Sequence, residues 1–299
     1  MPLHETQYPV LVTGARGLLG RALAPLLEGG EVRLTDLAEL DVTDAVPVAA
    51  IVRALRPRTI FHLAAWTDVD GAESHPDAVR RLNVDAAAHV ARAAAASGAI
   101  LVHMSTDFIF DGAKAGPYVE DDPPSPLGVY AASKAESEAV VRELLPERHL
   151  IVRTAWLYGT GRRNFVDVIL GAARQALAAA PDAPKPLRVV ADQVGNPTWS
   201  RDLARVIVAL VAAGARGTYH ACGSGAASRY ELACEALAAA GLRVPVEPIT
   251  SDNLPTPARR PHRAVLSTAK LERTLGAGLP SWRDSVRAYV REQRVKSEK

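Results

Sequence analysis

Two side chains near the middle of the chain have the spacing needed for proton transfer. Tyr130 and Lys134 are four positions apart in the segment YAASK, so on a helix both side chains lie on one face. A free tyrosine has a pKa of about 10, and a neighbouring ammonium group together with a cofactor cation is expected to lower it. We therefore predict that Tyr130 acts as a general acid or base near neutral pH.

A hydroxyl group from an earlier part of the chain would complete a carbonyl-reduction site. An apolar run with the composition of a buried strand ends in Ser105, Thr106 and Asp107, and a proline-rich loop leads from there to Tyr130. The Ser/Thr–Tyr–Lys combination predicts that Thr106 hydrogen-bonds the reacting oxygen. Lys134 would also hold the ribose of a nicotinamide cofactor.

Three glycines near the N-terminus predict the place of that cofactor. Gly14, Gly17 and Gly20 form G-x-x-G-x-x-G directly after an apolar run and open a stretch of helical periodicity. Such a loop gives a tight turn, lets a pyrophosphate approach the backbone and aims a helix N-terminus at that anion. The alternative is an ordinary turn between a strand and a helix.

The end of the next strand bears on the choice between NADH and NADPH. Asp36 lies where a carboxylate accepts hydrogen bonds from the adenosine ribose, which favours NADH. Arg16, inside the glycine loop, could pair with the 2′-phosphate of NADPH, but Asp36 would repel that phosphate. We therefore expect NADH or NADPH, with NADH favoured. Asp41 and Val42 are candidate adenine contacts; alternatively, Asp41 is an acid at a helix N-terminus.

Strands and helices that alternate along the chain would position these residues. Short apolar runs bounded by Gly, Pro or Asp indicate buried strands at Pro9–Thr13, Val32–Leu34, Thr59–Leu63, Ile100–Met104, Leu150–Arg153, Leu187–Val190 and Thr218–His220. Helical periodicity marks Gly17–Leu27, Asp44–Leu55, His75–Ser97, Gly128–Leu145 and Asn164–Ala178. This alternation predicts an α/β fold with a Rossmann-type, doubly wound parallel sheet.

The last part of the chain has a different organisation. Two proline-rich loops, Pro181–Pro186 and Leu254–Pro261, interrupt it. Helical stretches surround these loops at Arg201–Ala212, Arg229–Ala239 and Trp282–Arg294. We predict that residues 1–160 mainly form an NAD(P)-binding Rossmann domain to which 187–215 return. Residues 161–299 would mainly form a smaller C-terminal substrate-binding lobe over the strand ends.

Composition excludes several other classes of protein. The 299 residues are 48% hydrophobic and 23% charged, with a net charge of +2, which is typical of a globular protein without a nucleic-acid surface. No apolar run approaches the roughly 18–20 residues of a membrane span, and no secretory segment is evident. We expect a cytoplasmic protein. Cys222 and Cys234 give no disulfide framework, and no ligand spacing demands a metal.

Seven segments resemble the extended short-chain dehydrogenases/reductases: VTGARGLLG, AAWTDVDGAE, HMSTDFIFDG, PLGVYAASK, RTAWLYG, DQVGNPT and PTPARRPH. The last two are similar, more narrowly, to reductases of dTDP-linked 4-keto-6-deoxy sugars. The resemblance implies NADH- or NADPH-dependent reduction of the C4 keto group of dTDP-4-dehydro-L-rhamnose to dTDP-L-rhamnose. A homodimer is expected only from the tendency of the family.

The resemblance also implies roles for single residues. Those on the cofactor side are Gly17, Leu18 and Leu19 at the pyrophosphate, Asp36 at the ribose, Asp41 and Val42 at the adenine, and Ala65, Trp66, Thr67 and Met104 around the nicotinamide half. Thr106, Asp107 and Trp156 would touch the sugar, although Trp156 could instead be a core aromatic. Arg260 would lie near the diphosphate, unless its loop is only solvated.

Other interpretations stay open. Asn83 matches a proton-relay position of relatives, or is a helix-surface residue. A nucleotide-sugar dehydratase typically has an acid after Asp107, where this chain has Phe108; another reductase or epimerase of nucleotide-linked deoxysugars is less firmly excluded. A non-catalytic NAD(P)-binding regulatory subunit, of the kind found with methionine adenosyltransferase, also resembles this family.

Overall fold

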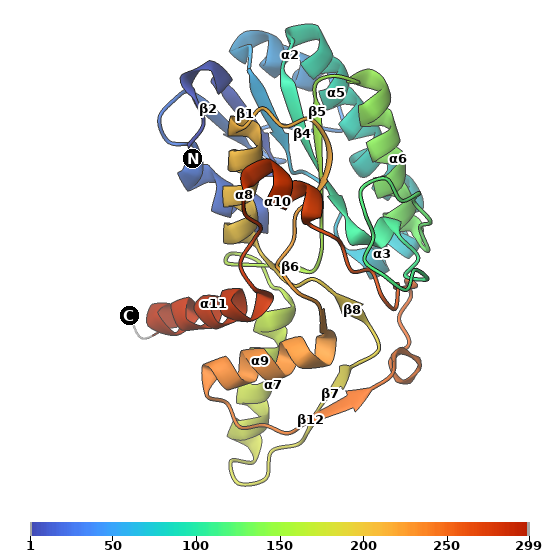
Figure 1. The fold of residues 1–299 in the computed structure, drawn as a ribbon, viewed down its shortest axis with the longest axis vertical. Coiled ribbons are helices and arrows are strands. Elements are labelled where there is room, and N and C mark those ends of the chain that lie inside the picture. Colours follow the sequence, from blue (N-terminus) through green and yellow to red (C-terminus); the bar gives the residue numbers. More distant parts are fainter. Residues whose placement is uncertain (1, 298–299) are drawn as a thin grey trace.

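A parallel sheet forms the larger of two bodies in the computed structural model, which describes residues 2–297 (Figure 1). Its strand order is β10-β5-β4-β3-β1-β2, and all neighbouring pairs are parallel. The strands are β1 (Val10–Thr13), β2 (Val32–Thr35), β3 (Thr59–His62), β4 (Ile100–Thr106), β5 (His149–Thr154) and β10 (Gly217–His220). The order reverses between β1 and β3, where sheets of this kind bind ligands. The predicted Rossmann-type α/β fold is confirmed.

Helices cover both faces of this sheet, as an all-parallel sheet with two apolar faces requires. One face carries α1 (Leu18–Leu23) with the 3-10 turn Ala24–Leu27, α8 (Ser200–Ala212) and α10 (Ala269–Leu275); the other carries α2 (Ala45–Leu55), α5 (Ala86–Ser97) and α6 (Val129–Leu144). Successive residues of β1 serve the two faces in turn: Val10 and Val12 join one core cluster, and Leu11 joins the other. Within residues 2–297, no helix is long and apolar enough to cross a bilayer.

The helix predicted over His75–Ser97 is divided in the structure. It follows the short helix α3 (Val69–Glu73) and consists of α4 (Pro76–Arg80), a π-helical turn (Arg81–Asp85) and α5. A π turn is wider than an α-helical turn and often lies beside a functional site. Here the turn carries Asn83, whose side chain is buried. The helix-surface alternative for Asn83 is therefore wrong.

The smaller lobe has its own core and lies at the ends toward which the main strands point (Figure 1). Its helices are α7 (Phe165–Ala179), α9 (Arg229–Ala240) and α11 (Trp282–Ser297). Three two-stranded sheets complete it: β7 (Leu187–Val190) with β12 (Val246–Ile249), β8 (Val194–Gly195) with β11 (Ala227–Ser228), and β6 (Leu157–Tyr158) with β9 (Thr198–Trp199).

The strand pairing revises one detail of the predicted division. The segment 187–215 was expected to return to the first domain, but β7 pairs with β12 and not with the central sheet. The return begins only at α8 and continues into β10, which pairs with β5. A short apolar run such as 187–190 indicates a strand without indicating which sheet it joins. The wider division into a cofactor domain and a substrate lobe stays a proposal.

A buried ion pair ties α6 to the centre of the sheet. Glu138, which is fully buried in α6, accepts hydrogen bonds from Nε and Nη2 of Arg153 in β5 at 2.9 and 2.8 Å. Arg153 also donates to the backbone oxygen of Glu120 at 2.9 Å, and the carboxylate of Glu120 accepts from the backbone N–H of His220 at 3.0 Å. These contacts fix α6 relative to β5 and β10.

Candidate active site

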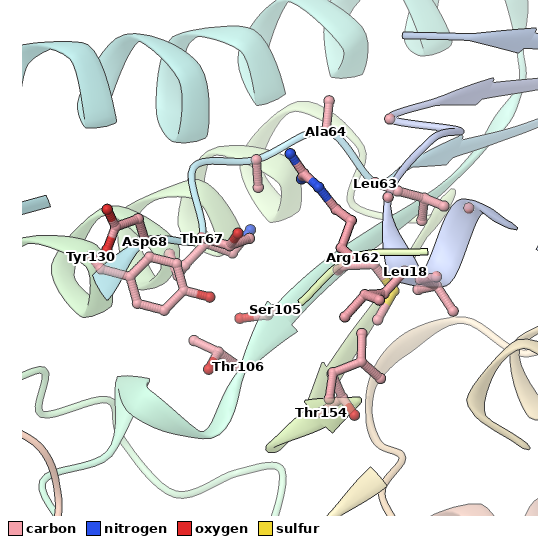
Figure 2. Close-up of a pocket in the computed structure, with 18 of the residues that line it drawn as sticks. Leu18, Leu63, Ala64, Thr67, Asp68, Ser105, Thr106, Tyr130, Thr154 and Arg162 are labelled. Carbon is pink, nitrogen blue, oxygen red and sulfur yellow. The ribbon is translucent and has the colours of Figure 1, made fainter. Parts of the chain in front are cut away.

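One face of α6 carries the two residues predicted to transfer the proton. Tyr130 and Lys134 both line a cavity of about 770 Å³ between the sheet and the lobe. The ring of Tyr130 directs its hydroxyl toward Ser105 and Thr106 at the end of β4 (Figure 2). The hydroxyl of Thr106 lies close enough to lower the pKa of Tyr130 by hydrogen bonding. The structure thus brings the predicted Thr–Tyr–Lys combination together.

The acidity of these groups depends mainly on burial. Burial raises the pKa of Tyr130 to about 12, and the charge of Asp107 acts in the same direction. Burial lowers the pKa of Lys134 to about 8, against the opposing effect of Glu138. Lys134 is not among the groups that act on the pKa of Tyr130 in this structure, and the lowering expected from the ammonium together with a bound cofactor cation stays a prediction. A tyrosine with so high a pKa stays protonated at neutral pH, which suits a proton donor.

Asp107 lies beside this pair and is almost completely buried. Its Oδ1 accepts a hydrogen bond from the Thr106 hydroxyl at 3.0 Å, while its Oδ2 has no hydrogen-bond partner in the part of the chain that the structure describes. Burial raises the pKa of Asp107 to about 7. The Thr154 hydroxyl, another lining group, is likewise buried without a partner there. Such polar atoms suit a ligand with hydroxyl groups.

Two glycines of the loop lie so close to other backbone atoms that neither position could carry a side chain. Gly14 has φ +69°, and a Cβ on it would lie 2.6 Å from the backbone nitrogen of Ala64, just after β3. A Cβ on Gly20 would lie 2.5 Å from the backbone oxygen of Ala15. Bare backbone at the reversal of strand order is what a dinucleotide needs. The residues present therefore fit that cofactor.

Asp36 lies at the far end of the same cavity. Burial acts to raise its pKa, but backbone hydrogen bonds from Arg16 and Leu37, both 2.9 Å long, hold the pKa below its usual value. The charges of the nearby Arg16 and Arg162 guanidinium groups also lower it. The side chain of Arg16 does not line the cavity, because its guanidinium pairs with Glu39.

Most of the predicted site residues line this single cavity. They are Gly14, Gly17, Leu18, Leu19, Gly20, Asp36, Asp41, Val42, Ala65, Thr67, Met104, Thr106, Asp107, Tyr130, Lys134 and Trp156. Arg16, Trp66 and Arg260 do not. The indole of Trp66 donates to the backbone oxygen of Asp68 at 2.8 Å. The guanidinium of Arg260 makes two hydrogen bonds to Asp70, at 3.0 and 2.7 Å.

Asn83 supports the loop that carries three of the predicted nicotinamide contacts. Its Oδ1 accepts from the backbone N–H of Trp66 at 2.7 Å, and its Nδ2 donates to the hydroxyl of Ser133 at 2.9 Å. Ser133 lies on α6 between Tyr130 and Lys134. Asn83 therefore joins the loop after β3 to the helix of the proton donor.

Trp156 occupies a strained position between the sheet and the lobe. Its φ is +45°, which is uncommon for a bulky residue. A Cβ on Gly195 would lie 2.7 Å from the indole nitrogen, so only glycine lets the ring approach β8 this closely. The guanidinium carbon of Arg229 lies 3.6 Å from the centroid of the indole ring. Trp156 is therefore held in place at the cavity and is not only a core residue.

The segment DQVGNPT, which contains Gly195, holds the loops around Trp156. The Oδ1 of Asn196 accepts from the backbone N–H of Leu266 at 2.8 Å, and its Nδ2 donates to the oxygen of Gly225 at 2.8 Å. The hydroxyl of Thr198 accepts from the N–H of Gly223 at 3.1 Å. The segment DQVGNPT, which the sequence singled out only by resemblance, therefore holds together the loops around Trp156.

Arg162, Arg163, Asn164 and Arg229 line the cavity but were not predicted as site residues. Arg229 directly follows a serine at the start of a predicted helix, a position at which an arginine is usually exposed to solvent. No spacing connects it with Trp156, 73 positions earlier in the numbering. Within residues 2–297, no group of three or more His, Cys, Asp or Glu side chains is arranged to hold a metal ion.

Fold and site together define a member of the extended short-chain dehydrogenase/reductase class. A family model described as "RmlD substrate binding domain" matches residues 8–295, nearly the whole chain. The chain belongs to this RmlD family.

Several characterised relatives are similar over most of their length. The dTDP-4-dehydrorhamnose reductase of Streptomyces griseus is 41% identical, over 91% of this chain and 90% of the relative. A dTDP-4-keto-6-deoxy-D-glucose reductase of Streptomyces niveus is 39% identical, over 86% and 87%. The crystal structure of dTDP-4-dehydrorhamnose reductase from Bacillus anthracis, in complex with NADP, has a TM-score of 0.89 at 34% identity and covers 95% and 98% of the two chains.

The pKa of Asp107 leads to a prediction about stability. Because burial raises this pKa to about 7, the folded state tolerates the ionised carboxylate poorly, and Asp107 contributes least to stability above pH 7. We expect Asp107→Asn to raise the Tm by a few degrees at pH 8 and by much less at pH 4.5, where the folded wild type is already protonated. Calorimetry at both pH values measures the difference.

Asp111→Asn is the matched control. Hydrogen bonds from the backbone of Ala113 and from Tyr118 lower the pKa of Asp111, so losing its charge is expected to reduce the Tm at pH 8. A gain for Asp107→Asn that is equal at both pH values would contradict the account of Asp107.

Proposed function

We propose that this protein reduces the C4 keto group of dTDP-4-dehydro-L-rhamnose to give dTDP-L-rhamnose, with NADH or NADPH as the reductant. The observation that carries the proposal is the convergence of Thr106, Tyr130 and Lys134 on the cavity that also contains the glycine loop. Membership of the RmlD family, and the names of its relatives, support the choice of sugar nucleotide.

The residues of the chain supply positioning and the proton. A bound reduced nicotinamide supplies a hydride to the carbonyl carbon. Tyr130, which its high pKa keeps protonated, gives its proton to the oxygen on which negative charge develops. The hydroxyl of Thr106 donates a hydrogen bond to the same oxygen and so stabilises that charge. Lys134, which lines the cavity beside Tyr130, would hold the ribose of a bound cofactor.

Three alternatives concern the substrate, the reaction or the presence of any activity. The relative that reduces a dTDP-4-keto-6-deoxy-D-glucose supports reduction of a related deoxysugar at the same site. An epimerase would recycle its cofactor, and a regulatory subunit would turn nothing over, so net NAD(P)H consumption separates both from a reductase. Phe108 in place of an acid disfavours the dehydratase. A cytoplasmic location and a homodimer stay predictions.

For the cofactor we propose that NADH is favoured. Asp36 lines the end of the cavity where we expect the adenosine ribose, and its charge would disfavour a 2′-phosphate. Glu39 accepts a hydrogen bond from the backbone N–H of Asp36 and pairs with the guanidinium of Arg16, which is therefore already engaged. The Arg162 guanidinium, which lowers the pKa of Asp36, offsets part of this negative charge. The NADP complex of a relative supports use of NADPH as a second cofactor.

The role of Tyr130 is tested by Tyr130→Phe. This change removes the proton donor and keeps the ring, so we expect kcat to fall about 10²–10⁴-fold, the range for general acid catalysis. The assay follows NADH oxidation in the presence of dTDP-4-dehydrorhamnose. Tyr118→Phe, which alters a tyrosine outside the cavity lining, is the control and should keep nearly full activity. Near-wild-type turnover by Tyr130→Phe would contradict the assignment of Tyr130 as the proton donor.

The cofactor proposal is tested by Asp36→Ala. Loss of the carboxylate should reduce kcat/KM for NADH about 10-fold or more, because hydrogen bonds to a charged acceptor are lost. The same change should leave kcat/KM for NADPH unchanged or raise it, because the repulsion of the 2′-phosphate is removed. Steady-state kinetics with both cofactors measures the ratio. A wild-type enzyme that already prefers NADPH would contradict the proposal.

A further inference from the structure

Four cationic side chains line the cavity in the part of the chain that the structure describes. Lys134 lies beside Tyr130 on α6. Arg162 lies at the cofactor end, where its charge acts on Asp36, and Arg163 is its neighbour in the same loop. Arg229 is the remaining cation. It lies beside Trp156 and close enough to Asp107 for each charge to influence the other, so it belongs to the substrate end.

The guanidinium of Arg229 lies over the indole ring of Trp156. Arg229 is the first residue of α9, and its guanidinium carbon lies 3.6 Å from the centroid of Trp156 and 5.2 Å from that of Phe165. Stacking on an indole fixes the plane of a guanidinium while its N–H donors point outward from the edge. Trp156 is itself fixed against Gly195. The donors of Arg229 are therefore preorganised.

Those donors have no protein acceptor within residues 2–297. The side chain of Arg229 makes no hydrogen bond there and no ion pair within 4.0 Å, although it is largely withdrawn from solvent. Burial lowers its pKa to about 10, so it is still charged at neutral pH. Because Arg229 is only partly exposed and its donors meet no protein acceptor, a ligand that brings acceptor oxygens would form hydrogen bonds that the protein itself does not supply. Forked donors match the oxygens of a phosphate group.

The residue that the sequence had suggested for this task is already engaged. Both terminal nitrogens of Arg260 bond to Asp70, and one of them also bonds to the hydroxyl of Thr256. Arg260 does not line the cavity. Its bidentate carboxylate contact would have to break before it could bind a phosphate, whereas Arg229 needs no such change.

We propose that Arg229 binds the diphosphate of the nucleotide-sugar substrate by its guanidinium edge, in the role first expected of Arg260. This inference rests on the proposed function, since it assumes a dTDP-linked sugar. Because Arg229 lies against Trp156, the residue that binds the diphosphate would directly contact the residue expected to touch the sugar. The diphosphate of the dinucleotide cofactor has the same chemistry, so an experiment must measure the two ligands separately.

The test compares Arg229→Gln, Arg229→Lys and Arg260→Gln with the wild type. Calorimetric titration measures Kd for dTDP and for NADH, and the inhibition constant of thymidine, which has no phosphate, is measured in the reductase assay. We expect Arg229→Gln to weaken dTDP about 10- to 100-fold, the range for lost charge-assisted hydrogen bonds. KM for the sugar nucleotide should rise with kcat nearly unchanged. Thymidine and NADH should change less than about twofold.

The two remaining variants separate binding from packing. Arg229→Lys keeps the charge and should recover part of the dTDP affinity even if Arg229→Gln folds poorly. Arg260→Gln should bind dTDP within about threefold of the wild type. Equal weakening of dTDP and thymidine in Arg229→Gln would show only a packing role, and a selective loss of NADH would assign Arg229 to the cofactor; either result overturns the inference.

The outcome for the proposed function is read independently from the wild type. If the wild type turns over dTDP-4-dehydrorhamnose and Arg229→Gln binds dTDP as tightly as the wild type does, the inference about Arg229 is overturned and the proposed function stands. A wild type that neither binds dTDP nor oxidises NADH or NADPH with the sugar nucleotide overturns the proposed function, and the inference with it.

Discussion

The buried contact between Glu138 and Arg153 is the constraint on which the site depends. Tyr130, Lys134 and Glu138 follow one another at intervals of four along one face of α6, so whatever fixes Glu138 also fixes the other two. Arg153 does so from β5 through two hydrogen bonds. Glu138 also raises the pKa of Lys134 against the effect of burial. Removing one partner of such a pair leaves a buried charge uncompensated, which is strongly destabilising.

The second constraint is the fixed position of Trp156 between the two bodies. Its positive φ, the bare backbone of Gly195 and the stacked guanidinium of Arg229 together place the lobe over the ends of β4 and β5. Both bodies line the cavity: β4 supplies Thr106 and α6 supplies Tyr130 from the larger body, and α9 supplies Arg229 from the lobe.

The sequence predicted the features that local patterns determine. The strands of the central sheet, the glycine loop and the pair on α6 follow from apolar periodicity and short spacing, and the structure has them. Properties set by distant contacts were not accessible: the π turn at Asn83, the pairing of β7 with β12, and the burial that raises the pKa of Tyr130. Arg260 was expected at the diphosphate from the resemblance to the family, and only the structure shows that its guanidinium is hydrogen-bonded to Asp70.

The central claim is that the cavity reduces a sugar carbonyl with net use of the cofactor and with a proton from the protein. Incubating dTDP-4-dehydrorhamnose with NADH deuterated at the transferable C4 position, and examining the sugar by NMR, tests it most directly. The account predicts deuterium at C4 of the sugar and one NADH oxidised for each sugar reduced. An altered sugar without net NADH oxidation, or a reduced sugar without deuterium at C4, would contradict it.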